Sequence, residues 1–318
     1  QMIVTLEQLN NAAEDFLDKN KSKVDFKVLN NYILSKHPTA KSEDLKKVIS
    51  CYAPVSDPKS SQITTKPTLP NWYKYTSKKH HNFRIYFQDI LDLPVKAKGN
   101  ISASSQELVN LLPDPRKPSI PPKSGLVIGN VQSGKTANYT ALVARAADIG
   151  YNLVIILSGG NFNDLRGQTQ SRLFTDLIDP VNNHSSSKKW HKATNIDRDK
   201  KVRGDVGDHL WDGDWDVSKN NCIVVSKKNA DTLKKLKKWL QEEIMLRSQA
   251  SNSPVNLLFI DDEADHASIN TSKPELDPTT INKKINELLA IFPKNIYVGY
   301  TATPFANVFI SPSETDIF

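Results

Sequence analysis

The chain has 318 residues, 38% of them hydrophobic and 24% charged, which suits one large domain plus a smaller one in a water-soluble protein. Its apolar runs are too short to cross a membrane, and no export signal opens the chain, so we expect a cytoplasmic protein without a membrane partner. Lys and Arg outnumber Asp and Glu by 42 to 35, and the resulting net charge of +7 favours anionic partners.

The first segment predicted to fold is a helical module spanning residues 1 to 53. Apolar residues recur there at helical spacing, and Thr5 with Gln8 has the pattern of a capping box. Asp25 and Ser42 are further candidate N-caps. Such a module either packs against the rest of the chain or reads DNA as a helix-turn-helix; no residue decides between the two, and we favour packing.

A linker and a second helical segment follow the module. Residues 54 to 70 combine prolines with Ser, Thr and Lys, a composition that predicts a linker. Residues 71 to 122 form a helical lead-in segment that ends near Leu112. Several prolines then precede the first expected strand.

From residue 123 to residue 318, apolar runs of strand length alternate with helical patterns. This alternation predicts an α/β fold, in which a parallel sheet is flanked by helices and preceded by a small all-α region. The expected strands contain residues 126–128, 153–157, 223–225, 257–260 and 296–300. The polar stretch from about residue 179 to residue 221 is predicted to be a loop. Ligands of such sheets bind at the carboxyl ends of the strands.

A phosphate-binding loop is predicted directly after the first strand. It consists of Gly129, Asn130, Val131, Gln132, Ser133, Gly134, Lys135 and Thr136. The glycines let backbone N–H groups converge on phosphates, and the positive end of the following helix reinforces the site. Lys135 supplies a cation for the phosphates, and Thr136 offers a hydroxyl to Mg²⁺. ATP and Mg²⁺ are therefore the predicted cofactors.

A cluster of carboxylic residues follows the strand at residues 257–260. We predict that Asp262 holds Mg²⁺ and that Glu263 is the general base that activates the attacking water. Asp261 would replace Asp262 if the strand ended one residue earlier. Lys135, Asp262 and Glu263 are thus the predicted catalytic residues.

Residues that couple nucleotide state to a neighbouring domain are expected beside the acidic cluster. Hydroxyl groups at the end of the last expected strand can form hydrogen bonds with the carboxylates of the acidic cluster. Thr301 and Thr303 are therefore predicted coupling residues. Asp265 and His266, within and next to the cluster, complete the predicted coupling set.

In combination and order, these motifs resemble those of a known family. Residues 129–136, 262–265 and 301–303 resemble motifs I, II and III of superfamily 2 helicases. More narrowly, residues 131–136, 165–170, 227–229, 261–265 and 299–307 resemble the Z-one domain family. That family consists of helicase-like P-loop ATPases of bacterial and phage restriction-type systems, and the resemblance spans about residues 70 to 318.

The resemblance implies a RecA-like P-loop domain, the first of two, that acts on nucleic acid. It assigns strand contacts to Asn161, Arg166, Gln168 and Gln170, and Lys227 and Lys228 are further candidates for phosphate contacts. The implied partners are DNA rather than RNA, a second RecA-like domain of the same full-length chain, and a nuclease or methyltransferase. We expect this chain to be a fragment that hydrolyses ATP poorly, because arginines of the second domain would complete the site.

The predicted function is ATP binding and hydrolysis by the N-terminal half of a helicase-like nucleic-acid translocase in DNA restriction or phage defence. The alternative is a nucleotide-gated protein-interaction switch that moves no strand. Stimulation of the ATPase by nucleic acid would distinguish the two.

Overall fold

The computed structural model of the chain describes residues 4–20, 26–52, 72–118, 122–128, 134–158, 163–185, 188–194, 216, 219–264 and 280–301. Contacts divide the chain into two compact units, Gln1–Leu112 with Ala137–Asp148, and Pro113–Thr136 with Ile149–Phe318. The predicted helical module and most of the lead-in segment therefore belong to one unit. The predicted linker, residues 54 to 70, lies outside the described residues.

The first unit is built from helices. They are α1 (Leu6–Lys19), α2 (Phe26–Lys36), α3 (Ser42–Cys51), α4 (His81–Arg84), the π-helical η1 (Ile85–Ile90), α5 (Val95–Leu111) and the part of α6 (Lys135–Ile149) from Ala137 to Asp148. The predicted capping box begins α1: the backbone N–H of Gln8 donates to Thr5 Oγ1 at 3.3 Å, and that of Thr5 donates to Gln8 Oε1 at 2.9 Å. The expected cap at Ser42 is not formed, because the helix begins at Ser42 and Lys41 occupies the cap position.

Arg145 lies in the core of this unit, with its side chain completely buried. Its guanidinium donates to Ser105 Oγ and to Tyr73 OH, both at 3.0 Å, and to Ser102 Oγ at 3.0 Å. The same group lies 3.5 Å from the centroid of the Phe83 ring. Neutral oxygens and an aromatic face thus satisfy a cation that is shielded from water.

The second unit contains a six-stranded sheet in which every neighbouring pair is parallel. Its strands are β1 (Lys123–Ile128), β2 (Leu153–Ser158), β3 (Trp190–Lys192), β4 (Asn221–Lys227), β5 (Asn256–Asp262) and β6 (Lys294–Thr301), and they pair in the order β1-β6-β5-β2-β4-β3. The predicted α/β class and parallel sheet are confirmed. Strands such as β2 are apolar along almost their whole length because both of their faces are buried.

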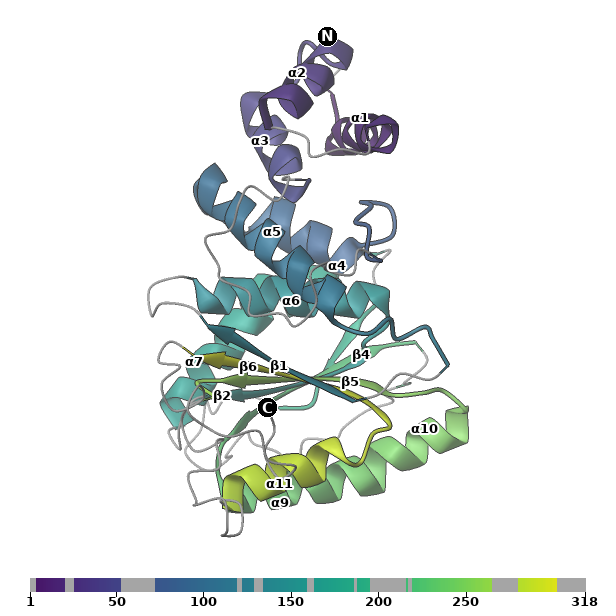
Figure 1. The fold of residues 1–318 in the computed structure, drawn as a ribbon, viewed down its shortest axis with the longest axis vertical. Coiled ribbons are helices and arrows are strands. Elements are labelled where there is room, and N and C mark those ends of the chain that lie inside the picture. The colour runs from purple at the N-terminus through teal and green to yellow at the C-terminus, as the bar shows by residue number, and fades with distance from the viewer. Residues whose placement is uncertain are drawn as a thin grey trace. The chain divides into compact units, whose positions relative to one another are not determined.

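Helices connect the strands. They are α6 (Lys135–Ile149), α7 (Asn163–Leu173), η2 (Phe174–Ile178), α8 (Asp179–Asn183), α9 (Ala230–Trp239), η3 (Leu240–Ile244), α10 (Met245–Ser251) and α11 (Thr280–Leu289). In Figure 1, α9, α10 and α11 lie along one face of the sheet. Leu233 and Leu236 of α9 and Leu288 of α11 share a core there with Phe259 of β5. None of the helices in the described ranges is both long and apolar enough to span a membrane.

The stretch from residue 179 to residue 221, predicted to be a loop, contributes α8 and β3. Trp190 of β3 is 4% exposed, and the hydroxyl of Thr194 accepts from the backbone N–H of Val225 at 3.0 Å. Lys192 forms an ion pair with Asp179. The loop prediction was wrong for these two elements, because a three-residue strand carries no readable alternation among so many charged residues. Residues 195–215 lie outside the described residues.

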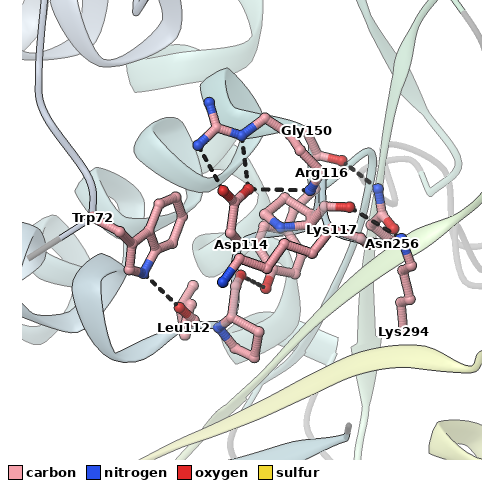
Figure 2. A network of polar contacts seen from close by, with 11 residues as sticks. Trp72, Leu112, Asp114, Arg116, Lys117, Gly150, Asn256 and Lys294 are labelled. Carbon is pink, nitrogen blue, oxygen red and sulfur yellow. Dashed lines mark hydrogen bonds and ion pairs between the residues drawn. The ribbon is translucent and has the colours of Figure 1, made fainter. Parts of the chain in front are cut away.

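Polar contacts fix the segment that leads into β1 at the amino ends of the strands (Figure 2). Lys294, the first residue of β6, donates from Nζ to the carbonyl oxygens of Pro115 and Lys117 at 3.1 and 2.6 Å. Arg116 donates from Nε and Nη2 to the two carboxylate oxygens of Asp114, each at 2.7 Å. This network lies at the edge of the sheet opposite to the carboxyl ends.

Candidate functional site

The candidate site lies where β1 and β5 end. Because the sheet is parallel, both strands end at the same edge, and only β6 separates them. Lys135, which follows β1, places Nζ 3.9 Å from Oδ1 of Asp262, the last residue of β5, and the two side chains are 16% and 19% exposed. Two groups predicted from separate parts of the sequence therefore meet.

The start of α6 presents the predicted phosphate-binding groups. Gly134 has φ of +74°, and Lys135 and Thr136 are the first two residues of the helix. A Cβ added to Gly134 would meet no atom within 4 Å, so the backbone conformation, not crowding, favours glycine there. The N-terminus of this helix carries the positive end of its dipole beside the Lys135 ammonium. The remaining loop residues, Gly129, Asn130, Val131, Gln132 and Ser133, lie outside the described residues.

Asp262 has the properties of a carboxylate that can bind a cation. Its Oδ1 is buried and has no hydrogen-bond partner among the described groups. Burial raises the pKa of Asp262, and the Lys135 ammonium opposes that rise. An oxygen ligand of this kind, together with the hydroxyl of Thr136, the residue after Lys135, fits the donor preference of Mg²⁺. Within the described ranges no three His, Cys, Asp or Glu side chains form a metal-binding group.

Asp261 has a different role from Asp262. Its side chain is completely buried, with Oδ1 2.5 Å from Lys228 Nζ in an ion pair, and Oδ2 accepts from the Tyr297 hydroxyl at 2.6 Å. Asp261 is thus committed to internal partners, and Asp262 faces Lys135. Sequence reasoning missed Tyr297; the available signal was a tyrosine between Ile296 and Val298 in a buried strand.

Glu263 has an unusual backbone conformation directly after β5. Its φ is +58°, in the left-handed region that non-glycine residues rarely adopt. Lys228 Nζ donates to the Glu263 carbonyl oxygen at 2.5 Å, and the N–H of Ala264 donates to the Tyr300 carbonyl oxygen at 2.9 Å. These contacts hold the turn at Glu263. The side chain of Glu263 is exposed, next to Asp262 in the chain.

Of the predicted coupling residues, the structure describes Thr301. It is buried at the end of β6, in register with Ile128 of β1, and Tyr300 before it is in register with Asp262. Thr301 therefore lies between the end of β1 and the acidic turn, and its coupling role stays a prediction. Asp265, His266 and Thr303 lie outside the described residues.

The residues predicted to contact nucleic acid divide into two groups. Arg166 and Gln170 are buried in α7, where Arg166 Nη1 donates to Gln170 Oε1 at 3.0 Å, and Lys228 is buried as described above. Gln168 is exposed and Lys227 is half-buried. Asn161 lies outside the described residues.

A comparison of the sequence with models of protein families gave no match, and a comparison with curated proteins also gave none.

Proposed function

We propose that this chain binds ATP with Mg²⁺ at the carboxyl edge of its sheet and hydrolyses it. The observation that carries the proposal is the approach of Lys135 to Asp262, whose buried Oδ1 has no hydrogen-bond partner among the described groups. The ammonium lies at a helix N-terminus, and the carboxylate lies on β5, two strands away from β1. A polyphosphate with a divalent cation requires this arrangement.

Each residue has a defined task in this proposal. Lys135 neutralises charge on the β- and γ-phosphates, and Thr136 and Asp262 provide oxygen ligands for Mg²⁺. The bound ion would supply charge neutralisation on the phosphates. Glu263 accepts a proton from a water molecule whose oxygen attacks the γ-phosphorus. The bond between that phosphorus and the β–γ bridging oxygen breaks, which releases ADP and inorganic phosphate.

The wider proposal is that ATP turnover drives a helicase-like nucleic-acid translocase of RecA-like P-loop type in DNA restriction or phage defence. It rests on the order of the three motifs along the chain, on their resemblance to Z-one domain proteins, and on the net charge of +7. The exposed Gln168 and half-buried Lys227 are the candidate contacts with a nucleic-acid backbone. Thr301 would relay the state of the nucleotide site to a second RecA-like domain.

Nucleotide binding is the first test. Titration of the chain with a fluorescent ATP analogue and Mg²⁺ should give saturable binding that Lys135→Ala abolishes. Lys123→Ala is the matched control, because Lys123 begins β1 at the opposite edge of the sheet. Equal affinity in the wild type and Lys135→Ala would refute the proposal.

Hydrolysis with and without DNA tests the wider proposal. In the full-length protein, Glu263→Gln should retain nucleotide binding and lose turnover. In the full-length wild type, single- or double-stranded DNA should raise the ATPase rate of a translocase. A rate that ignores both would favour a nucleotide-gated interaction switch, with the same site and no strand movement.

A further inference from the structure

One buried ammonium serves two neighbours of Asp262. Lys228 Nζ lies 2.5 Å from Asp261 Oδ1 and donates to the Glu263 carbonyl oxygen, also at 2.5 Å. The side chains of Lys228 and Asp261 are both completely buried. Lys228 therefore holds the residue on each side of the proposed magnesium ligand, and it is inaccessible to a bound strand.

The contact joins parts of the sheet that are not hydrogen-bonded to each other. Lys228 follows β4, whereas Asp261 and Glu263 belong to β5 and its turn, and β2 lies between the two strands. Neighbouring strands are about 4.8 Å apart, so the lysine side chain has to extend across the end of β2 to reach its partners. Few side chains other than lysine combine that length with a compact donor.

The strain at Glu263 indicates what the contact does. A left-handed non-glycine residue persists only where its surroundings over-determine it, and such residues concentrate at functional sites. Two contacts of the turn meet that condition: the Lys228 ammonium fixes the Glu263 carbonyl, and the following N–H bonds to Tyr300. Fixing the backbone of Glu263 also fixes the direction of its Cα–Cβ bond, from which the carboxylate extends.

We propose that Lys228 is a positioning residue that holds the Glu263 turn in its left-handed conformation and so aims the Glu263 carboxylate. This inference rests on the proposed function in its catalytic consequence, but the conformational statement stands without it. Asp261 holds the ammonium in place through the ion pair, and the Tyr297 hydroxyl orients Asp261. The prediction from sequence that Lys228 contacts phosphates is replaced here by an internal role.

A double variant separates this role from plain stability. Lys228→Met alone leaves the Asp261 charge buried without its lysine partner and is expected to lower stability strongly. Lys228→Met with Asp261→Asn removes both buried charges, so its stability should return toward the wild-type value. The Glu263 carbonyl, however, stays without its lysine donor in both variants. Lys294→Met is the matched control, because Lys294 also donates to backbone carbonyls but lies at the opposite edge of the sheet.

Three measurements on the whole chain decide the matter. Urea unfolding should show that the double variant is more stable than Lys228→Met. Hydrogen–deuterium exchange should be faster in the double variant for peptides covering residues 261 to 264, and unchanged there in Lys294→Met. Single-turnover hydrolysis should be slower by about tenfold or more, with the affinity for ATP within about twofold of the wild type.

The outcomes for the two proposals are distinguishable. If the double variant recovers both stability and hydrolysis, or if exchange at residues 261 to 264 is unchanged, Lys228 has only a structural role and the inference is overturned. If the wild type binds no ATP, the proposed function fails. The exchange measurement then still decides whether Lys228 holds the turn.

Discussion

Lys135 Nζ and Asp262 Oδ1 are 3.9 Å apart, which is too far for a hydrogen bond yet close for opposite charges at a sheet edge. The two groups are close enough for one bound ligand to contact both of them. The carboxylate of Asp262 can bind a divalent cation only while it is ionised. We therefore expect the affinity for nucleotide to depend on a divalent cation only in that state.

The first prediction concerns this dependence. Asp262→Asn should weaken ATP binding in the presence of Mg²⁺ by about tenfold or more, equivalent to about 1.4 kcal/mol, because an amide oxygen is a poorer magnesium ligand. Isothermal titration with Mg²⁺ and with EDTA measures the effect, and EDTA should leave the variant little changed. Asp231→Asn, at an exposed position in the first turn of α9, is the control. A variant with undiminished magnesium dependence would contradict the assignment.

The second prediction uses the strain at Glu263. Glycine tolerates φ of +58°, whereas alanine does not, so Glu263→Gly should be more stable than Glu263→Ala by about 1 kcal/mol. Urea denaturation of the two variants measures this difference, and both should lack hydrolysis. Equal stability of the two would show that the turn relaxes when the side chain is shortened.

The third prediction concerns the buried guanidinium of Arg145. Arg145→Lys should lower the free energy of unfolding by about 2–4 kcal/mol, because one ammonium cannot reach Ser105, Tyr73 and Ser102 together. Chemical denaturation monitored by circular dichroism measures the change. Arg172→Lys in α7, where the side chain is exposed, should change stability by less than about 0.5 kcal/mol. Similar losses in the two variants would argue against a special role for Arg145.

The fourth prediction is a pH dependence that originates at His80. Burial lowers the pKa of His80 from 6.5 to about 4, and Nδ1 lies 2.9 Å from Thr76 N and 2.8 Å from Thr76 O. A folded-state pKa below the unfolded value means that the unfolded chain binds more protons between those limits. Stability from this group is therefore present above pH 6.5 and is lost as pH falls toward 4, by about 2 kcal/mol at pH 5.

Asp148 has to be separated from this effect, because its contribution has the opposite sign. Burial raises its pKa from 3.8 to about 7, although backbone and side-chain N–H groups of Asn82 and the N–H of Phe83 donate to it. Its contribution is present at low pH and is lost as pH rises through 7. The test is thus the stability difference between the wild type and His80→Asn, which should shrink on acidification from about pH 7.5 to pH 5. A difference that is constant with pH would exclude His80 as the source.

The sheet was predictable because its strands are apolar and flanked by helical patterns. A strand such as Leu153–Ser158 is apolar over almost its whole length, which occurs where both faces are covered. The meeting of Lys135 with Asp262 was predictable as well, since parallel strands share one carboxyl edge. Both inferences use local patterns together with one general rule of topology.

The contacts of Lys228 and the conformation of Glu263 were not predictable in this way. Lys227 and Lys228 are identical in the sequence, and only the position of Asp261 across the end of β2 makes the second of them buried. Position 263 is neither glycine nor asparagine, the residues that signal a left-handed conformation in a sequence. Both features depend on long-range contacts that no sequence window contains.

The strand order has a consequence for how the protein is made. Within the described part of the sheet, β1 pairs only with β6, which follows β2, β4 and β5 in chain order. On the ribosome, the segment that carries the phosphate loop must wait for β6 before it can join the sheet, while β2, β4 and β5 are free to pair earlier. Nascent chains that stop before residue 294 should therefore lack a formed nucleotide pocket.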